Sequence, residues 1–259
     1  MNFGIIIQAR MDSKRLQGKV LKEYKKISPL KLLMDKIAFI GLKGSTIIAT
    51  TNKKNDLKII NFCKRNNIKY FAGSNENVLK RYYECSNKFK IKNIIRLTAD
   101  CPFLDISLLK RMISIYKNNK YDYLSNAYPL PCKFPDGSDI EIFSFNALKE
   151  AFYNAKLPSE KEHVTNYIYE KKFNNIKRID LKNDLSKFRY TIDNFNDFKV
   201  FEEILKVFKY DKIIKLKYYQ ITNFLKKNKK LTQYQKKLQR NYGWKSSLDK
   251  DIKYLKTNS

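Results

Sequence analysis

The sequence predicts an α/β fold in which a mainly parallel central sheet is covered by helices and followed by a helical C-terminal extension. Three observations support this prediction. Short apolar runs alternate with longer segments whose apolar residues recur at helical spacing, which is the pattern of β-α-β units. The 259-residue chain is 43% hydrophobic and 14% aromatic, so it can bury a substantial core. The first strand leads directly into a basic loop, and open α/β sheets bind ligands at the carboxyl ends of their strands.

The expected elements follow one another in a regular order. Apolar and β-branched runs predict strands at residues 3–7, 46–51, 69–71, 93–97, 121–125 and 140–143. Apolar residues at helical spacing predict intervening helices at residues 29–40, 55–66, 76–89 and 106–116. The second half adds helices at residues 145–155 and 159–170 and strands at residues 176–181 and 188–192. The crossovers between parallel strands are expected to be right-handed.

The chain divides by pattern into two parts. Residues 1–208 carry the strands and helices of one α/β domain, while residues 209–259 are rich in lysine. Ile213, Leu216 and Ile221 keep a rough apolar face along the second part. We therefore expect a helical extension there and not a disordered tail.

Composition and cysteine spacing indicate in which cellular compartment the protein works. No apolar run approaches the roughly 18 residues that cross a membrane, and strand-like sequence begins at once, so we expect neither a membrane span nor a signal peptide. The chain has four widely spaced cysteines without a CxxC pair, which argues against zinc and disulfide sites. These features suit a cytoplasmic protein.

The formal net charge of +29 is compatible with nucleic-acid binding. The excess is mostly lysine spread over the whole chain, whereas a nucleic-acid binder more often concentrates Arg, Lys and aromatic residues in one patch. The nearest approach is residues 206–240, where Tyr218, Tyr219 and Tyr234 alternate with lysines, and an amphipathic tail with a solvated lysine face explains this stretch better. A basic RNA-binding protein remains an alternative, but we do not expect nucleic acid as the partner.

The loop after the first strand has the residue types that bind polyphosphate. Arg10, Lys14, Arg15 and Lys19 supply cations, and Ser13 adds a hydroxyl. The chain contains neither GxxxxGK[ST] nor GxGxxG, which excludes the commonest phosphate loops. An ordinary basic loop is the alternative, and the position at a strand end favours phosphate binding.

Two carboxylates follow two later predicted strands. Asp100 and Asp193 should both lie at the carboxyl edge of the sheet, near the basic loop. Two carboxylates that share a site repel each other unless a cation lies between them, and Mg²⁺ prefers one or two carboxylates together with phosphate oxygens. Structural roles stay open: Asp100 as a turn or N-cap residue, although Asp105 is better placed to cap, and Asp193 as the N-cap of the next helix.

The chain resembles a known family at several motifs. These are Gln8-Ala9-Arg10-Met11 with Ser13, Arg15, Leu16, Gly18, Lys19, Val20 and Leu21, then Asp100-Cys101-Pro102, Glu162-His163-Val164-Thr165, Arg189-x-Thr-x-Asp193, and a segment from Asn241 to Leu248. They are similar to those of the cytidylyltransferases of the spore-coat polysaccharide type, relatives of acylneuraminate and 3-deoxy-manno-octulosonate cytidylyltransferases. The resemblance implies a Rossmann-like nucleotide-diphospho-sugar transferase fold, with residues 1–208 as the nucleotidyltransferase domain.

The resemblance also implies an activity, which is transfer of CMP from CTP to an acidic sugar or a small phosphorylated acceptor, with release of pyrophosphate, in surface polysaccharide or glycoconjugate biosynthesis. It implies Asp100 and Asp193 as ligands of Mg²⁺. Arg10, Arg15 and Lys19 would neutralise the triphosphate, which makes all five residues candidates for catalysis. The implied nucleotide-binding residues are Gln8, Ala9, Arg10, Ser13, Arg15, Lys19, Thr51, Asn52, Gly73, Ser74 and Arg81.

The acceptor side has weaker signals. Asp136 lies in a turn, and Asp139 and Glu141 face the same side of the strand that follows. Asp139 and Glu141 could accept hydrogen bonds from sugar hydroxyls or pair with Arg189, and the two interpretations are equally supported. Their acid-x-acid spacing also keeps a glycosyltransferase of the same fold, using a sugar nucleotide donor, as an alternative. A lone histidine such as His163 is more often packed than catalytic, although the resemblance places it near the acceptor.

Three residues depart from the family pattern: Asp12 and Ala99 replace glycines, and Gln17 replaces a proline. Asp12 places an acid beside the proposed phosphates, so it must point away from them, pair with a neighbouring cation or help hold the metal. The expected partners are a nucleoside triphosphate and a small acidic or phosphorylated acceptor, with a homodimer as an assembly to test.

Overall fold

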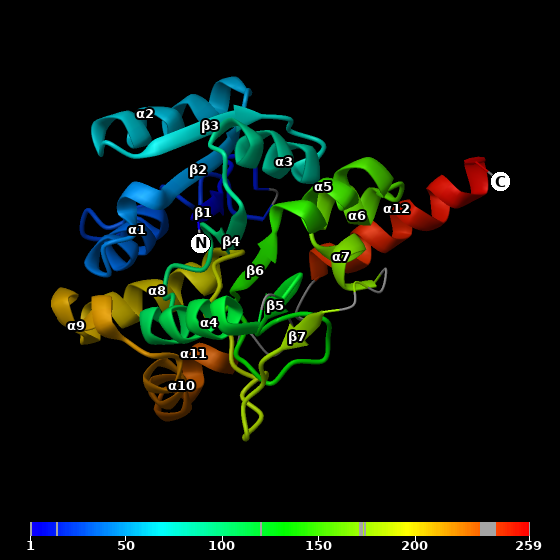
Figure 1. Cartoon of the computed structure of the whole chain (residues 1–259). Coiled ribbons are helices and arrows are strands. Elements are labelled where there is room, and N and C mark those ends of the chain that lie inside the picture. The colour runs from blue at the N-terminus through cyan, green and yellow to red at the C-terminus, as the bar shows by residue number, and fades with distance from the viewer. Residues whose placement is uncertain are drawn as a thin grey trace.

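The structure, a computed structural model, describes residues 2–13, 15–119, 121–170, 173, 175–233 and 242–258. Its centre is a seven-stranded sheet in the order β3-β2-β1-β4-β6-β5-β7 (Figure 1). The strands are β1 (Phe3–Gln8), β2 (Thr46–Thr51), β3 (Lys69–Gly73), β4 (Asn93–Thr98), β5 (Tyr123–Ser125), β6 (Glu141–Ser144) and β7 (Ile176–Arg178).

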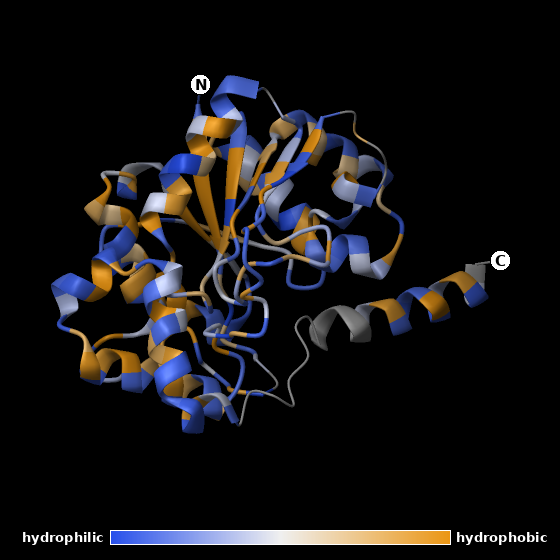
Figure 2. Cartoon of the chain, turned by 90° about the horizontal axis from the view of Figure 1, so that it is seen from below, coloured by the Kyte–Doolittle hydropathy of each residue, from blue (hydrophilic) through white to orange (hydrophobic). Residues whose placement is uncertain are grey.

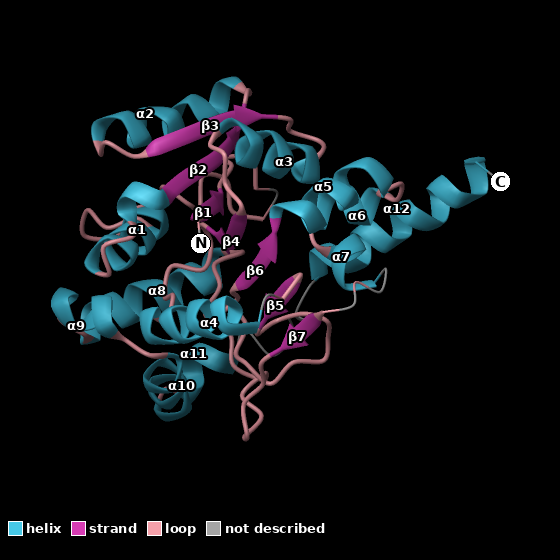
Figure 3. Cartoon of the chain, in the orientation of Figure 1, coloured by secondary structure: helices cyan, strands magenta, loops and turns pink. Residues whose placement is uncertain are grey.

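Helices surround this sheet (Figure 3). They are α1 (Pro29–Phe39), α2 (Leu57–Arg65), α3 (Val78–Lys88), α4 (Ile106–Asn119), α5 (Phe145–Asn154), α6 (Pro158–His163), α7 (Asn166–Glu170), α8 (Phe195–Val207), α9 (Tyr210–Lys215), α10 (Tyr218–Lys227), α11 (Lys229–Gln233) and α12 (Tyr242–Asn258), with short 3-10 helices η1 (Lys43–Ser45) and η2 (Lys54–Asp56).

Strand pairing confirms the mainly parallel sheet. β1 pairs in parallel with both β2 and β4, β2 pairs in parallel with β3, and β7 pairs in parallel with β5. β6 is antiparallel to its neighbours β4 and β5. The chain runs from β1 outward to β2 and β3 and then returns to the other side of β1 as β4. The order therefore reverses between β1 and β4, which is where an open α/β sheet forms its ligand crevice.

Alternation along the strands divides the core between the two faces. Ile5 and Ile7 of β1 pack with α1, α2 and α4, whereas Ile6 packs with α3 and α5. Successive side chains of a strand point to opposite faces, so an uninterrupted Ile-Ile-Ile run serves both layers. Figure 2 shows the central strands as predominantly hydrophobic.

Two predicted elements differ from the structure. Residues 188–192 form one isolated bridge, between Asp136 and Arg189, in place of a strand. Phe188, Tyr190 and Ile192 alternate into an apolar cluster, which gives the segment a strand-like pattern without a neighbouring strand. The helix predicted at 159–170 is divided into α6 and α7, because Val164 adopts a φ of 67°.

The segment after residue 208 packs closely on the rest of the chain. Ile213 of α9 and Ile221 of α10 join Phe201 and Ile204 of α8 in one cluster. The buried Lys36 of α1 donates from Nζ to the carbonyls of Ile213 and Ile214, at 2.6 and 2.9 Å. This packing does not test whether residues 1–208 and 209–259 are separate domains, so that division stays a prediction.

Beyond these helices, α12 packs on α6, and its C-terminal end extends away from the sheet (Figures 1 and 2). None of the described helices is both long and apolar enough to span a bilayer. Lys14 of the basic loop, Tyr234 and Asn241 lie outside the described residues, as do the side chains of residues 242–246.

Candidate active site

The backbone brings together the two carboxylates that the sequence placed far apart. Asp100 follows β4, whose end lies beside the end of β1, since Ala99 N donates to Gln8 O at 3.1 Å. The segment before Asp193 is attached to the same turn: Ile192 N donates to Asp100 O at 2.8 Å, and Thr191 Oγ1 donates to it at 3.3 Å. Residues 188–192 do not form the predicted strand. The hydrogen bonds of Thr191 and Ile192 to this turn nevertheless place Asp193 next to Asp100.

Lys19 lies between these carboxylates. Its Nζ donates to Asp100 Oδ2 at 2.7 Å and to Asp193 Oδ1 at 2.8 Å, and only 8% of the residue is exposed. Burial by itself would lower the pKa of the Lys19 ammonium, but the two carboxylates outweigh it and raise that pKa above its ordinary value. Arg15 also reaches Asp193, with Nη2 3.0 Å from Oδ1. Of the predicted cations, Lys19 and Arg15 thus form one cluster with the two acids.

Arg189 holds Asp193 from the other side. Its guanidinium pairs with Asp193 and Asp136, and its Nε lies 3.3 Å from Asp197 Oδ1. Asp197 Oδ2 accepts the backbone N–H of Asp193 at 2.9 Å. Burial alone would raise the pKa of Asp193, but Lys19, Arg189 and Arg15 bring it well below its usual range.

The capping residues are neither of the two site carboxylates. Asn194 is the N-cap of α8, with Asp197 completing a capping box. Asp105 accepts from the N–H groups of Ser107 and Leu108 at the start of α4, at 2.9 and 3.0 Å. Capping therefore does not explain Asp100 or Asp193.

The carboxylate pair fits the requirements of a divalent cation. Oxygens of Asp100 and Asp193 converge on one cationic atom, and Mg²⁺ commonly takes one or two protein carboxylates with phosphate oxygens and water. Among the described residues, no group of three or more His, Cys, Asp or Glu is arranged to hold a metal. These two residues could hold the ion if the substrate and water supplied the other ligands.

Asp12, the acid that departs from the family pattern, pairs with a neighbouring cation. Its carboxylate accepts from Lys53 Nζ at 3.2 Å and from Asn55 Nδ2 at 3.0 Å, and the hydrogen bonds to Asn55 and Lys53 lower its pKa. Met11 N donates to Asp56 Oδ1 at 2.6 Å. The basic loop is therefore tied at two adjacent residues to the connection between β2 and α2.

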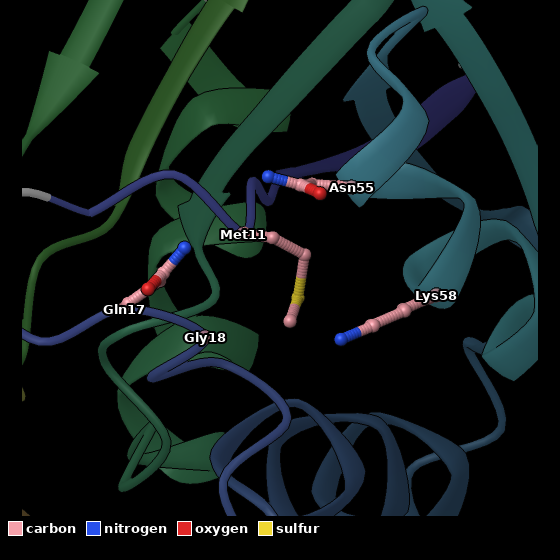
Figure 4. Close-up of a pocket in the computed structure, with 5 residues that line it drawn as sticks. All are labelled: Met11, Gln17, Gly18, Asn55 and Lys58. Carbon is pink, nitrogen blue, oxygen red and sulfur yellow. The ribbon is translucent and has the colours of Figure 1, made fainter.

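A cavity of about 300 Å³ lies on the α2 side of the loop, lined by Met11, Gln17, Gly18, Asn55 and Lys58 (Figure 4). Gly18 has a φ of 68°, which favours glycine, and its N–H donates to Met11 O at 2.9 Å to close the loop. The lining does not include Lys19 or the two carboxylates. The cavity is therefore beside the ionic cluster and not at it.

Arg10 and Ser13, the other predicted phosphate-binding residues of the loop that the structure describes, are both open to solvent to some extent. Arg10 is exposed and Ser13 is half-buried, with the Ser13 N–H donating to Met11 O at 3.0 Å. Ala9 N continues the sheet by donating to Ala49 O at 3.1 Å. Arg10 and Ser13 are thus accessible to a ligand at this end of β1.

The predicted nucleotide-binding turn after β3 is held by Arg81. The Arg81 side chain is buried and donates from Nη1 to Ser74 O at 2.9 Å, while its buried Nε has no hydrogen-bond partner. A Cβ at Gly73 would lie 2.6 Å from the Phe71 ring, so any side chain there would force that ring to move. Arg81 therefore shapes the turn.

Two other predicted nucleotide-binding residues lie after β2. Thr51 is buried and its hydroxyl donates to Asp56, whereas Asn52 is exposed. Asn52 is the one of the two that can meet a ligand directly.

Glu141 is buried in a network that sequence reasoning did not find. It pairs with Arg96, which is opposite it in the antiparallel register, and accepts from Tyr123 Oη at 2.8 Å and Thr165 Oγ1 at 2.5 Å. Arg96 also donates to Gln8 Oε1 at 3.2 Å. The sequence did carry one signal for this network: Arg96 lies among the apolar residues of β4, and a buried arginine needs an acidic partner.

The three acids predicted on the acceptor side, Asp136, Asp139 and Glu141, have different surroundings in the structure. Arg189 pairs with Asp136, for which this pairing was not predicted, whereas Glu141 pairs with Arg96 and not with Arg189 as the ion-cluster interpretation expected. Asp139 is half-buried just before β6.

His163 links α6 to α12. Its Nε2 lies 3.0 Å from Ser247 Oγ, and that hydroxyl donates to Glu162 Oε2 at 2.9 Å, so Nε2 must be the donor. Burial lowers the pKa of His163 to about 4, which leaves the imidazole neutral. Asp251 adds a second link by accepting from Ser159 N at 2.8 Å.

Comparison with known proteins adds independent information. Residues 4–242 match the sequence model of a family described as cytidylyltransferase. An uncharacterized protein of Methanocaldococcus jannaschii is 34% identical over 226 residues, covering 86% of this chain and 90% of that protein. The spore coat polysaccharide biosynthesis protein SpsF of Bacillus subtilis is 35% identical over 170 residues, covering 63% of this chain and 68% of SpsF. The solved structure of a cytidylyltransferase from Leptospira borgpetersenii superposes with a TM-score of 0.83 at 30% identity, covering 93% of this chain and 99% of that one.

Proposed function

This chain belongs to the cytidylyltransferase family and is a nucleotidyltransferase, and from that premise we propose that it transfers CMP from CTP to an acidic sugar or a small phosphorylated acceptor, releasing pyrophosphate. The observation that carries the proposal is the meeting of the basic loop with Asp100 and Asp193 at the point where the strand order reverses. Similarity to the protein SpsF supports a place in surface polysaccharide or glycoconjugate biosynthesis.

The loop cations would bind the triphosphate. Arg10, Arg15 and Lys19 would neutralise the β- and γ-phosphates, which carry the charge of the leaving pyrophosphate. The acceptor oxygen then attacks the α-phosphorus in line, so the work of the protein is mostly positioning and charge stabilisation. Asp100 and Asp193 are the residues that would hold Mg²⁺, which supplies neutralisation of the charge on the reacting phosphate.

Residues behind this layer keep the site in place. Arg189 and Asp197 hold the Asp193 carboxylate and its backbone. Arg96 donates to Gln8, at the end of β1, and pairs with Glu141 of β6. These contacts fix the side chains of the three residues relative to one another. We assign Asp136, Asp139, Glu141, His163 and Arg189 to the acceptor side, with Glu141, His163 and Arg189 acting through their neighbours.

The nucleoside would lie over the turn after β3. Gly73 and Ser74 offer backbone groups there, Arg81 fixes their conformation, and Asn52 is exposed nearby at the end of β2. Small residues let a base approach the backbone closely. CTP as the substrate rests on family membership.

The test is pyrophosphate release with each of the four nucleoside triphosphates against a panel of acidic sugars and phosphorylated small molecules. We expect release with CTP and one acceptor class. Lys19→Ala should remove that activity while leaving the circular dichroism spectrum unchanged, because a triphosphate contact is lost and the fold is not. Near-normal CTP-dependent release by this variant would show that the loop has been assigned wrongly.

The same assay separates the alternatives. A glycosyltransferase would consume a sugar nucleotide and release a nucleoside diphosphate in place of pyrophosphate. An RNA-binding protein would show binding with steep salt dependence and no nucleotide turnover.

A further inference from the structure

The position of Lys19 has a consequence for how the site takes up its ligands. The ammonium is the group that joins the Asp100 and Asp193 carboxylates, at 2.7 and 2.8 Å. Carboxylates at this spacing repel each other without a cation, so Lys19 is their counter-ion in the ligand-free protein. The residue is buried, which makes each of these contacts stronger than on the surface.

A divalent ion would need the same oxygens. Mg²⁺ binds carboxylate oxygens at about 2.0–2.1 Å, so an ion bound to both oxygens on the side where Nζ lies would overlap the ammonium, and the two cations compete for that one position. Lys19 must therefore leave before a metal enters. A buried ammonium that loses both partners is strongly disfavoured unless another anion receives it.

The triphosphate is that anion. We propose that Lys19 is a built-in counter-ion that closes the Asp100 and Asp193 pair to divalent ions when the nucleotide is absent, and that the bound triphosphate draws Lys19 away so that nucleotide and metal bind together. This inference rests on the proposed function, which supplies the nucleotide.

The surroundings allow Lys19 to move without collapse of the site. Asp193 keeps its pairing with Arg189 and its backbone bond to Asp197, so its carboxylate stays in place after the ammonium leaves. Asp100 is held through its carbonyl by Ile192. Because coupling between two ligands is reciprocal, the metal should tighten nucleotide binding by the same factor by which the nucleotide tightens metal binding.

The direct test measures Mn²⁺ binding without nucleotide, by the electron paramagnetic resonance signal of free Mn²⁺. Lys19→Met removes the charge and nearly keeps the side-chain length, so it should bind Mn²⁺ at least about tenfold more tightly than the wild type. Lys19→Arg keeps a cation between the carboxylates and should stay close to the wild type. Adding Asp100→Asn to Lys19→Met should remove the gain, which would locate it at this pair.

Lys53→Met is the matched control. Lys53 also pairs with a carboxylate of this region, Asp12, but that carboxylate lies in an exposed pair and does not face a second acid in the described contacts. The same loss of charge should leave Mn²⁺ affinity unchanged there. An equal gain in Lys53→Met and Lys19→Met would reduce the effect to net charge and overturn the proposal.

Thermal melting provides a second measurement, and refolding by Mn²⁺ extends it to a variant that is unfolded without metal. Lys19→Met should melt below the wild type in EDTA and gain more stability than the wild type when Mn²⁺ is added. If the variant is unfolded in EDTA, refolding by Mn²⁺ supports the proposal, and failure to refold refutes it. In the wild type, a non-hydrolysable CTP analogue with Mn²⁺ should stabilise more than the sum of the two alone, and this excess should shrink in Lys19→Met.

The outcomes separate this inference from the proposed function. Unchanged or weaker Mn²⁺ binding by Lys19→Met, when the wild type turns over CTP, refutes the counter-ion role and leaves the proposed function standing. Tighter Mn²⁺ binding by the variant, when the wild type uses CTP with none of the acceptors, refutes the proposed function and supports the counter-ion role of Lys19.

Discussion

The ammonium of Lys36 should make the stability of this protein depend on pH in a predictable direction. Lys36 is fully buried, and its Nζ donates to two backbone carbonyls, of Ile213 and Ile214, at the end of α9. Burial lowers the pKa of Lys36 to about 7, and Asp105 offsets only part of this effect. The unfolded chain keeps the ordinary pKa of about 10.4 and binds the proton throughout the neutral range.

The sign follows from proton counting. Between about pH 7 and pH 10 the unfolded state holds more protons at this residue than the folded state, so the free energy of unfolding rises with pH. The slope approaches about 1.4 kcal/mol per pH unit once the folded residue is neutral, which gives about 2 kcal/mol between pH 7 and pH 9. The buried cysteines and tyrosines oppose this rise, because burial raises their pKa values and the folded state then keeps their protons at high pH.

The assay therefore compares variants at each pH. Urea unfolding of wild type and Lys36→Met at pH 7, 8 and 9 should show the wild type gaining on the variant as pH rises, since methionine cannot titrate. Lys31→Met is the control on the same helix, because Lys31 lies in a surface pair with Asp35. Parallel pH dependence in wild type and Lys36→Met would refute the reasoning.

Three further predictions concern the site and its supports. Arg189→Met should lower the free energy of unfolding by about 3–5 kcal/mol in urea, because the buried Asp136 and Asp197 carboxylates lose this cation; a loss below about 1 kcal/mol would mean that these acids find other partners. Asp12→Gly should leave the melting temperature nearly unchanged but weaken CTP binding in titration calorimetry, since the loop loses its tie to Lys53; unchanged binding would show that the tie is dispensable. Asp251→Ala should cost about 1–2 kcal/mol and expose α12 to limited proteolysis, because a buried N–H of Ser159 loses its acceptor; equal protection of α12 in both proteins would contradict this.

Local pattern predicted most of the secondary structure. The Ile-Ile-Ile run of β1 predicted a strand buried on both faces, and helical spacing predicted α1, α3 and α4 to within a few residues at their ends. The same reasoning was wrong for residues 188–192, because alternate burial of Phe188, Tyr190 and Ile192 mimics a strand although no ladder is present. It also missed the interruption at Val164, since no sequence signal marks a positive φ at a valine.

The sequence alone determined the residue types of the site and their places at strand ends. A parallel sheet with short crossovers collects the carboxyl ends of its strands at one edge, so the basic loop and Asp100 had to lie near each other. Charge also set the expectation that two carboxylates would need a cation between them.

Only the tertiary structure decided which cation that is and where each acid points. Hydrogen bonds of Ile192 and Thr191 bring Asp193 next to Asp100. Asp12 pairs with Lys53, and Glu141 pairs with Arg96. These partners are far apart in the chain, and in a protein with 54 Lys and Arg many pairings satisfy the same charges. The choice among them depends on distance and burial, which exist only after the strands have packed.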